Sequence, residues 1–443
     1  MHIPRIQALL LVLWFSSPAF GEIPAIDGQF SEWKEEHLVA RDDQGDATGA
    51  FDITTVSART NGSQLYLHYD IGRDINLQNG PDSDGTLRLV VELSDQQQLT
   101  IDFRKRTAML NTQPVAWSRL GFSCMPTHAS KQYELQFDMA EFGLETGDEI
   151  SLDFSGSDEL AEAVSIVLTA DQSRQSEVSF DRTDKSSFRI ANLNTHGQGL
   201  SDGNRAESIQ RLLGATDADI FCFEEEWEEE MFRRSAPNLI PQDGSAEVNL
   251  HWSGGCGIAA SLKLEPVPMT LERGAAALVE LPTGDLVTVI SVHLKCCGYS
   301  GNREDKMRIR EARQLAVQIR RLRDGDFGEK PRNGGIVIIG DYNLVGSRKP
   351  LEILKIAGLT DVLLREPTRG AAYTWRSLRE DESFWPGRLD LVMYAQAGLK
   401  PANGFVLDTA KLSEQSLAGL GLRAQDSLVS DHLLLVADFV PVH

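Results

Sequence analysis

Asp341 and Asn343 are two residues whose types and spacing indicate a chemical function. They end an apolar run, Ile336 to Asn343, that reads IVIIGDYN. Residues two positions apart in a strand point to the same side, so the run predicts a carboxylate and an amide delivered together at a strand end. Such a pair suits a phosphate beside a metal ion. For this stretch alone, the alternative is an Asp-Asn turn after a core strand.

Polar side chains recur at the ends or starts of other strand-like runs. Open sheets bind ligands at the carboxyl ends of their strands, so residues from several strands can form one site. The candidates are Asn194 at the end of FRIANLN, Glu224 and Glu225 at the end of DIFCFEE, His293 at the end of LVTVISVH, Asp390 inside RLDLVMY, and Asp431 and His432 in SDH before LLLVADF. Together these positions predict a site where metal ligands and proton donors meet.

The ordered set of motifs resembles the endonuclease/exonuclease/phosphatase superfamily, which includes secreted deoxyribonucleases, abasic-site endonucleases, sphingomyelinases and inositol-polyphosphate phosphatases. The resemblance covers residues 186 to 443 and implies an α/β fold, a two-sheet α/β sandwich. GDYN is similar to the family's GDFN motif, and RLD and SDH follow in the family's order. Two positions depart from the pattern: Glu224 replaces the usual Gln, and Leu433 follows SDH in place of Pro. Neither departure removes a catalytic atom.

The resemblance also implies a role for each site residue. The implied metal ligands are Asn194, Glu225 and Asp431. Their hard oxygen atoms would hold Mg²⁺ or Mn²⁺, and Ca²⁺ is also compatible with them. The remaining residues are implied to be catalytic: His293, Asp341, Asn343, Asp390 and His432. Asp341 would orient or deprotonate the attacking water while Asn343 binds the phosphate. Asp390 would orient His432, a second group for proton transfer or phosphate contact, and His293 would donate to the phosphate or assist the leaving group.

The first 21 residues have the features of a secretory signal peptide. Arg5 precedes an apolar segment from Ala8 to Phe15, and Ala19-Phe20-Gly21 forms a small-residue cleavage site. A membrane anchor is the alternative, but the apolar run is short for a bilayer, and no later run approaches about 20 apolar residues. We therefore expect a mature chain without a transmembrane segment that is secreted or periplasmic.

Residues 22–169 change to a period-two pattern, as in Leu65, Leu67, Tyr69 and Ile71. Strands with one dry and one wet face predict a separate N-terminal all-β sandwich. The segments IDG and SEW, with the acidic stretch before DITTVSA, resemble the family-9-like carbohydrate-binding modules. The resemblance implies a possible glycan ligand, although the module could also be only a spacer or docking domain. Trp33 and Trp117 are candidates for sugar stacking, with core packing as the alternative.

An acidic stretch of the front module offers a second candidate ligand site. The stretch contains Asp42, Asp43, Asp46 and Asp52. Their carboxylates could hold a calcium ion, or the stretch could be a solvated acidic loop. The chain has a net charge of −22, most of it before residue 185. This balance argues against long-range attraction of the whole protein to nucleic acid, but it does not exclude a nuclease.

The length of 443 residues exceeds one comfortable core, which predicts more than one domain. Residues 170–187 are polar and aperiodic and are predicted to link the front module to a catalytic domain at 188–443. Within that domain, helices are expected at 204–213 and around 303–323. Most arginines of the second helix are expected on a solvated face, with the cleft rim as the alternative. The acidic run Glu224 to Glu230 is expected mostly at the surface, except for Glu225.

The five cysteines are an odd number, so at least one thiol has no partner within the chain. Cys222 lies in an apolar run and is expected to be a buried small hydrophobe. Cys256 could pair with Cys296 or Cys297, because both segments flank the predicted cleft. A zinc site that uses His293 is a further alternative, but no CxxC spacing accompanies it.

The sequence thus predicts an exported, divalent-metal-dependent phosphoesterase. A phosphodiesterase acting on nucleic acid is the first choice, a phospholipid or sugar-phosphate hydrolase the second, and a catalytically inert surface or glycan-binding protein the third. The expected specificity loops contain Trp252, Tyr299 and Trp375, which could stack on a base, cover a lipid head group or simply pack. The set of costly carboxylates argues against the inert alternative.

Overall fold

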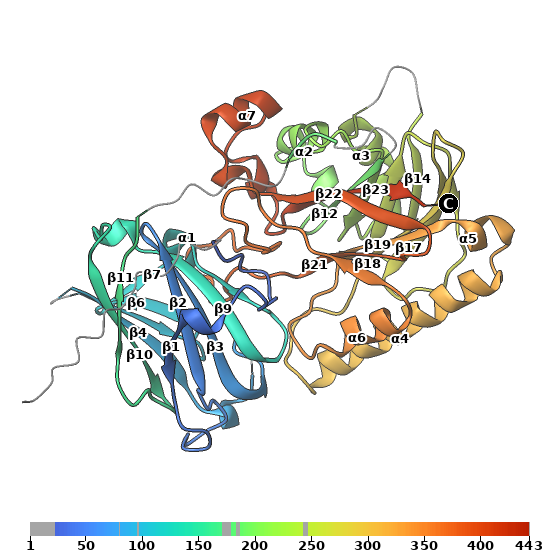
Figure 1. Cartoon of the computed structure of the whole chain (residues 1–443). Helices are drawn as coiled ribbons and strands as arrows, with labels where there is room; N and C mark the ends of the chain where they lie inside the picture. The colour runs from blue at the N-terminus through green and yellow to red at the C-terminus, as the bar shows by residue number, and fades with distance from the viewer. Residues whose placement is uncertain are drawn as a thin grey trace, which may run out of the picture.

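The computed structural model describes residues 23–442, apart from 79, 95–96, 171–178, 183–186 and 242–246. The predicted signal peptide and most of the predicted linker therefore lie outside the described residues. Within the described part of the chain, the strands form four sheets, two in the front half and two in the back half. Figure 1 shows the two halves lying against each other. No helix in this part is long and apolar enough to cross a bilayer.

The front half is the predicted all-β sandwich. One sheet has the order β1-β2-β3-β9-β8 and the other β11-β10-β4-β5-β6-β7. The strands are β1 Leu38–Arg41, β2 Thr55–Asn61, β3 Gln64–Ile75, β4 Leu87–Ser94, β5 Gln97–Asp102, β6 Thr107–Leu110, β7 Gln113–Val115, β8 Ser123–Met125, β9 Ser130–Asp138, β10 Glu149–Gly156 and β11 Val164–Val167. The helical turns are η1 Glu35–His37, η2 Asp82–Asp84, α1 Trp117–Leu120 and η3 Ala140–Phe142.

The back half is a two-sheet α/β sandwich, with sheet orders β14-β15-β13-β12-β23-β22 and β16-β17-β18-β19-β21-β20. The strands of the first sheet are β12 Phe188–Asn194, β13 Ile220–Glu224, β14 Asn249–Ser253, β15 Cys256–Ala260, β22 Leu399–Leu407 and β23 Leu434–Pro441. The strands of the second are β16 Leu264–Pro266, β17 Gly274–Glu280, β18 Leu286–His293, β19 Gly335–Asp341, β20 Thr360–Val362 and β21 Asp390–Tyr394.

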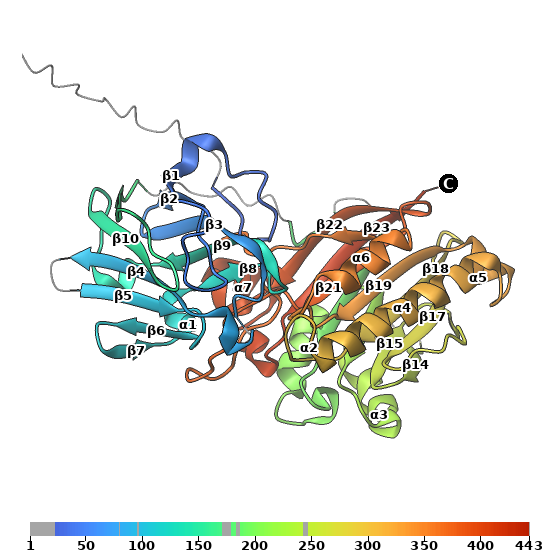
Figure 2. The same cartoon turned by 90° about the horizontal axis from the view of Figure 1, so that it is seen from below.

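Helices cover the outer faces of these two sheets (Figure 2). The helices are α2 Ala206–Gly214, α3 Glu229–Leu239, α4 Arg303–Asp324, α5 Glu329–Asn333, α6 Lys349–Ile356 and α7 Glu414–Leu420, with turns η4 Gly199–Ser201, η5 Thr409–Lys411 and η6 Asp426–Val429. Apolar residues such as Ile190, Val289 and Ile339 fill the space between the sheets. Because both faces of the central strands are covered, their sequences are continuous apolar runs rather than alternating ones.

Helix α4 differs from its prediction at one arginine. Of the apolar stripe that the sequence predicts, Ala312, Leu315, Ile319 and Leu322 are buried, as expected for an amphipathic helix, and Ala316 is half-buried. Arg308, however, is fully buried rather than solvated. Its guanidinium donates to the carbonyl oxygens of the loop that follows β18, including that of Cys297 at 3.3 Å. Helix α4 therefore fixes the shape of a loop beside the site.

The alternation of β3 and β9 correctly predicted strands, but the expected wet face of these strands is dry. Tyr66, Glu134 and Gln136 are all almost fully buried. Tyr66 belongs to an apolar cluster that includes Ile26 and strands of the back half. Glu134 accepts hydrogen bonds from the backbone N–H of Asp27 and from the Trp33 indole at 2.9 Å, and burial raises its pKa to about 8. The second face is therefore an interface and not a solvated surface.

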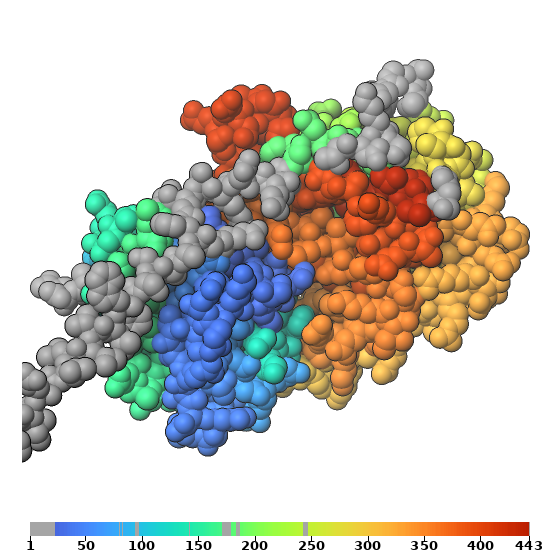
Figure 3. Space-filling model, in the orientation of Figure 1, coloured from blue at the N-terminus to red at the C-terminus, as the bar shows by residue number. Residues whose placement is uncertain are grey.

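Several further contacts join the two halves, which lie in direct contact in the space-filling view (Figure 3). Trp385, from the long segment between β20 and β21, is buried in the core of the front sandwich beside Trp117 and Phe122. Ion pairs connect Asp27 with Arg365 and Asp138 with Arg369. The front module is thus joined to the back half by a packed interface.

The candidate ligand residues of the front module have other contacts. Trp117 packs against Trp385 inside the core, and the Trp33 ring stacks on His68 at 5.6 Å. The core-packing alternative is therefore correct for Trp117. Among the acidic residues, Asp42 and Asp46 converge with Asp158, which the sequence did not indicate. Asp52 instead accepts from the backbone N–H of Gly45 at 2.9 Å.

Candidate active site

Strand register brings three predicted catalytic residues to one edge of a sheet. Strands β18 and β19 are parallel and place His293 opposite Asp341. Strands β19 and β21 are antiparallel and place Asp390 opposite Asp341. All three side chains are almost fully buried. Their meeting point is therefore fixed by the sheet, which holds it more firmly than a loop could.

Asp341 is the centre of this arrangement. Its Oδ2 accepts from Nδ2 of Asn343 at 2.7 Å and from Nδ2 of Asn194 at 3.3 Å, and it lies 3.6 Å from Nε2 of His293. Its Oδ1 accepts from the backbone N–H of Asn343 at 2.9 Å. Burial, with repulsion from Asp390, raises the pKa of Asp341 well above its usual range although His432 opposes the shift. The charged ring of His432 favours the ionised form of Asp341, which is the form that can accept a proton.

Asn343 reaches Asp341 through a turn rather than along a strand. Strand β19 ends at Asp341, and Asn343 has a φ of +49°, in the left-handed region that Asn tolerates better than most residues. The two sequence interpretations therefore apply together. The Asp-Asn turn, given above as the alternative to a functional pair, is what places the Asn343 amide against the Asp341 carboxylate.

His432 and Asp390 form a buried pair. Nδ1 of His432 lies 2.9 Å from Oδ2 and 3.0 Å from Oδ1 of Asp390, and Nε2 lies 3.8 Å from Oδ2 of Asp341. Burial disfavours the charged ring, but the carboxylates of Asp390 and Asp341 outweigh it and raise the pKa of His432 to about 10. The ring is therefore a cation near neutral pH, with its free Nε2–H directed toward Asp341.

His293 has the opposite charge state. Burial, assisted by the positive charges of Arg273 and His432, lowers the pKa of His293 to about 3. The ring is thus neutral near pH 7, and it lies 5.6 Å from the ring of Trp227. Its Nδ1 is buried without a hydrogen-bond partner among the described residues. Two histidines in one site therefore differ in charge, as expected of groups with different tasks.

Glu225 and Asn194 meet as the metal-site prediction requires. Oε1 of Glu225 accepts from Nδ2 of Asn194 at 3.3 Å and lies 4.0 Å from Nε2 of His293. Oε2 accepts from the backbone N–H of Gly197 at 2.8 Å. The same Asn194 amide also donates to Asp341, so two carboxylates converge on one amide. Converging carboxylate oxygens are the hard donors that Mg²⁺ and Mn²⁺ prefer, so these residues fit a divalent cation.

Asp431, the third predicted metal ligand, makes different contacts. Its Oδ1 lies 2.9 Å from Nδ1 of His196, and its Oδ2 accepts from the Trp375 indole at 3.0 Å. Asp341, Asp390 and His432 form a second group whose ligand atoms lie within 4.8 Å of one another. The sequence did not indicate His196, although it follows the strand end at Asn194 by only two residues.

The prediction that the acidic run is mostly at the surface is wrong for its first part. Glu224 and Glu226 are fully buried, whereas the Glu225 side chain is partly exposed. Glu224 accepts from Ser291 Oγ at 2.7 Å and from Asn192 Nδ2 at 3.0 Å. Burial, with repulsion from Asp390 and Asp341, raises the pKa of Glu224 well above its usual range. A protonated Glu has a donor and an acceptor, as Gln does, which explains why Glu can stand at this position.

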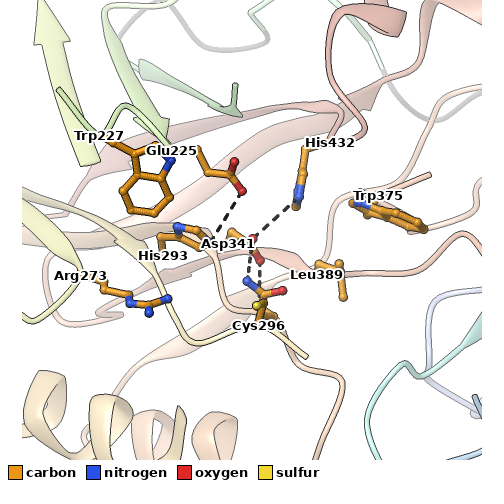
Figure 4. A pocket seen from close by; sticks show the side chains of 10 residues that line it. Glu225, Trp227, Arg273, His293, Cys296, Asp341, Trp375, Leu389 and His432 are labelled. Carbon is orange, nitrogen blue, oxygen red and sulfur yellow. Dashed lines mark hydrogen bonds and ion pairs between the residues drawn. The ribbon is translucent and has the colours of Figure 1, made fainter. Parts of the chain in front are cut away.

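These residues line a pocket of about 420 Å³. Figure 4 shows Glu225, His293, Asp341 and His432 facing one another across it. The full lining is Glu225, Trp227, Arg273, His293, Cys296, Asp341, Asn343, Trp375, Leu389 and His432. Of the three aromatic residues predicted in specificity loops, only Trp375 is among them; the Trp252 indole instead donates to the carbonyl oxygen of Glu226 at 2.6 Å.

Sequence reasoning missed the walls supplied by Trp227, Arg273 and Leu389. Trp227 is about half exposed and lies three residues after the end of β13 at Glu224. A Trp within a run of acidic residues, close after the end of a strand that carries a site residue, was the sequence signal that could have indicated this wall. Arg273 precedes β17 in a segment without a motif, so the sequence offered no sign of its position.

All five cysteines lie within the described residues and are free thiols. Cys256 is fully buried in β15 and is a free thiol, so the pairing with Cys296 or Cys297 that the sequence left open is not formed. Cys222 is a buried small residue, as predicted. Cys296 and Cys297 instead lie close to each other at the pocket, with their Sγ atoms 2.8 Å apart.

Comparison with known proteins gave a match to a family model and matches among solved structures. A model of the Endonuclease/Exonuclease/phosphatase family matches residues 191–432, more than half of the 443-residue chain. No curated protein matched. Among solved structures, the 3′ phosphatase NExo from Neisseria, bound to a product DNA hairpin, is 22% identical, with 57% of this chain and 99% of that chain covered and a TM-score of 0.41. The human Nocturnin catalytic domain with bound sulfate is 17% identical, with 59% and 97% covered and a TM-score of 0.41.

Proposed function

The chain belongs to the endonuclease/exonuclease/phosphatase family and is an enzyme that acts on phosphoester bonds, and we propose that it is a divalent-metal-dependent phosphodiesterase with nucleic acid as substrate. The observation that carries the proposal is the convergence of two amides and two histidines of different charge on one oxygen of a buried carboxylate, Asp341 Oδ2. Hydrolysis of a phosphoester needs an activated water and a neutralised phosphoryl group, and this set offers both.

Asp341 is the proposed base. It accepts a proton from a water molecule whose oxygen attacks phosphorus while the bond to the leaving oxygen breaks. The charged ring of His432, oriented by Asp390, donates a hydrogen bond to a non-bridging oxygen and stabilises its growing negative charge. The amide of Asn343 and the neutral ring of His293 hold the phosphate against Asp341. These roles follow from charge state and position around one oxygen.

Glu225 and Asn194 are the proposed holders of the divalent cation, with Asp431 as a third ligand. When bound, the cation neutralises charge on the phosphoryl and leaving oxygens. Mg²⁺ is the first choice and Mn²⁺ the second, because the donors are carboxylate and amide oxygens; Ca²⁺ also takes such donors.

The pocket wall supports a nucleic-acid substrate over the other phosphoesters. Trp227 lines the pocket beside His293 and is 48% exposed, so a flat aromatic face is open to solvent next to the phosphate position. A base adjoining the scissile phosphate can stack on such a face, a contact worth about 1–3 kcal/mol. Arg273 adds a positive charge to the same wall. Phospholipid and sugar phosphate are the competing substrate classes.

The test is hydrolysis of bis-p-nitrophenyl phosphate and p-nitrophenyl phosphate with Mg²⁺, Mn²⁺ or Ca²⁺ and after EDTA. We expect metal-dependent turnover of the diester that Asp341→Ala and His293→Ala abolish and that Asp324→Asn, on an exposed position of α4, retains. Single-stranded DNA and RNA, phospholipid vesicles and sugar phosphates are then compared. Trp227→Ala should raise KM for the nucleic acid about tenfold, and Trp227→Phe should restore most of it.

The inert glycan-binding alternative gives the opposite result. A folded chain without turnover under any metal, but with retention on a polysaccharide that Glu225→Ala leaves unchanged, would overturn the proposal. A preference for vesicles or sugar phosphates over nucleic acid would keep the phosphoesterase and replace the substrate class.

Export is also part of the proposal and is supported by the sequence of residues 1–21. Cell fractionation and N-terminal sequencing of the mature chain test it. Cleavage after Gly21 with recovery outside the cytoplasm is expected, and an uncleaved cytoplasmic chain would contradict it.

A further inference from the structure

The adjacent cysteines at the pocket have no part in the proposed reaction. Cys296 lines the pocket together with Asp341 and Asn343, and Figure 4 shows it at the pocket's edge near Asp341. Cys297 is exposed, and its Sγ lies 2.8 Å from that of Cys296. By contrast, Cys124, Cys222 and Cys256 are fully buried. The two thiols of the described chain that are not fully buried therefore lie next to each other, and Cys296 is part of the pocket wall.

The surrounding backbone holds the two thiols together. The buried guanidinium of Arg308 donates to the carbonyl oxygens of Lys295 and Cys297, and Glu311 accepts from the backbone N–H of Lys295 at 2.7 Å. Cys297 has a φ of +70°, a conformation that costs free energy for a residue with a Cβ and that persists only where neighbouring contacts impose it. The convergence of the sulfurs is thus built into the loop.

We propose that Cys296 and Cys297 are a redox modification site, at which the two thiols form a reversible vicinal disulfide by exchange with a small-molecule disulfide. One thiolate attacks a sulfur of the external disulfide and forms a mixed disulfide, with release of one external thiolate. The other thiolate then attacks the sulfur of that mixed disulfide on the protein, closes the ring and releases the second external thiolate. Both cysteines are oxidised and the external disulfide is reduced to two thiols; one of their protons comes from the Cys297 thiol and the other from solvent, because Cys296 is already a thiolate.

Two features favour exchange at this position. Nζ of Lys295 lies 3.5 Å from Sγ of Cys296, and positive charge beside a thiol favours the attacking thiolate. The hydrogen bond from Cys297, with the charge of Lys295, lowers the pKa of Cys296 to about 5. Neighbouring Cα atoms are about 3.8 Å apart, closer than in ordinary disulfides, so the closed ring is strained and is readily reduced again. The bond is therefore switchable rather than structural.

Ring closure changes the charge of the pocket. In the reduced form, a thiolate at Cys296 adds negative charge to a wall that must accept an anionic phosphoester, whereas the disulfide is neutral. The oxidised enzyme therefore binds the anion more tightly. We expect KM for bis-p-nitrophenyl phosphate to be about two- to fivefold lower in the oxidised form, the usual size of one solvent-screened charge pair at a protein surface. This kinetic consequence rests on the proposed function, whereas the chemistry of the thiols does not.

The first experiment requires no turnover. The full chain is equilibrated with oxidised and reduced glutathione, its fast-reacting thiols are counted, and its intact mass and the peptide that contains both cysteines are measured. The reduced chain should show two fast thiols, and the oxidised chain none, with loss of two hydrogens and no retained glutathione. Cys297→Ser should instead keep a glutathione adduct on Cys296. Two unreacted thiols, or an adduct retained on the wild-type chain, would overturn the proposal.

The second experiment compares KM for the oxidised form with KM after reduction by a phosphine, which does not bind the divalent cation as a dithiol would. The decrease in KM on oxidation should be absent in Cys297→Ser treated in the same way. A closed ring with an unchanged KM would overturn the effect on the pocket. Absence of any phosphoester turnover would refute the proposed function while the thiol count still decides whether the site exists.

Discussion

Oδ1 of Asn76, in the front module, accepts a hydrogen bond of 2.7 Å from the backbone N–H of Ser300, in the loop that also holds Cys296. The same side chain donates through Nδ2 to the carbonyl oxygen of Val345 at 2.9 Å, just beyond the Asp341–Asn343 turn. Asn76 is almost fully buried. One amide of the front module therefore ties together two loops of the active site.

We expect Asn76→Ala to raise KM for a phosphodiester about tenfold with a smaller fall in kcat. The loops at Ser300 and Val345 lose their shared anchor, whereas Asp341 and His293 stay on their strands. The buried groups left unpaired should also lower the free energy of unfolding by about 1–3 kcal/mol. Steady-state kinetics below the unfolding transition separate the two effects, and Asn76→Asp should restore part of KM because it keeps the acceptor for Ser300. Exposed Asn238→Ala serves as control, and an unchanged KM would refute a positioning role.

Trp385→Ala should destabilise the chain by about 3–5 kcal/mol, the usual cost of removing a buried aromatic ring. Trp385 is 2% exposed and packs edge-to-face against Phe103, Trp117 and Phe122 inside the front sandwich. Urea denaturation followed by circular dichroism gives the change. Leu378→Ala, at a partly exposed position of the same segment, should change stability by less than about 0.5 kcal/mol. Equal effects of both substitutions would contradict the anchoring role.

The sequence predicted the strand ends well, because apolar runs that stop at a polar residue report directly on strands buried on both faces. Strands β12 and β18 have the expected bounds. The period of two in the front module predicted its sandwich for a different reason, because alternation indicates strands with one buried face. It could not show that the second face of β3 and β9 is covered, because periodicity describes a strand and says nothing of its neighbour across an interface.

Burial was mispredicted where charge alone was taken as the guide. Arg308, Glu224 and Glu226 are charged residue types in charged stretches, yet each is buried with polar partners from distant parts of the chain. Local sequence does not contain those partners. The same limit applies to one pocket wall, since no motif in the local sequence marks Arg273 as a residue of the site.

Asp390→Asn should shift the alkaline limb of the pH–rate profile to lower pH by one unit or more. Asp390 and Asp341 raise the pKa of His432 to about 10, so removal of one carboxylate lowers that pKa and leaves the ring less protonated at pH 10. The stabilisation that the charged pair gives the folded wild type is complete below about pH 6.5 and is lost as the pH rises to about 10. A shift of about one unit lowers the protonated fraction of the ring about fivefold at pH 10 and hardly changes it at pH 6, and kcat should follow that fraction. A pH-independent decrease would show that Asp390 acts only on structure.

Glu224→Gln should stabilise the chain at high pH and have little effect near pH 5. The pKa of Glu224 in the folded state is raised far above its unfolded value of about 4.3, because the carboxyl is buried beside Asp390 and Asp341. Below about pH 4.3, the group is protonated in both states and costs nothing; as the pH rises toward the folded pKa, folding requires it to hold a proton that the unfolded chain has released. Stability is therefore lost with rising pH, and Gln, which keeps hydrogen-bonding groups for Ser291 and Asn192, removes that loss.

The free energy of unfolding of wild type and Glu224→Gln is measured in urea, with EDTA present, at pH 5 and at pH 8. The gain in stability of the variant over wild type should be about 1–3 kcal/mol larger at pH 8 than at pH 5. Glu230→Gln, at an exposed position, should show no such pH dependence. Equal differences at both pH values would mean that Glu224 is ionised in the folded chain over the whole range. The departure from Gln at this position would then place a permanent buried charge behind Asp341, with Ser291 and Asn192 as its donors.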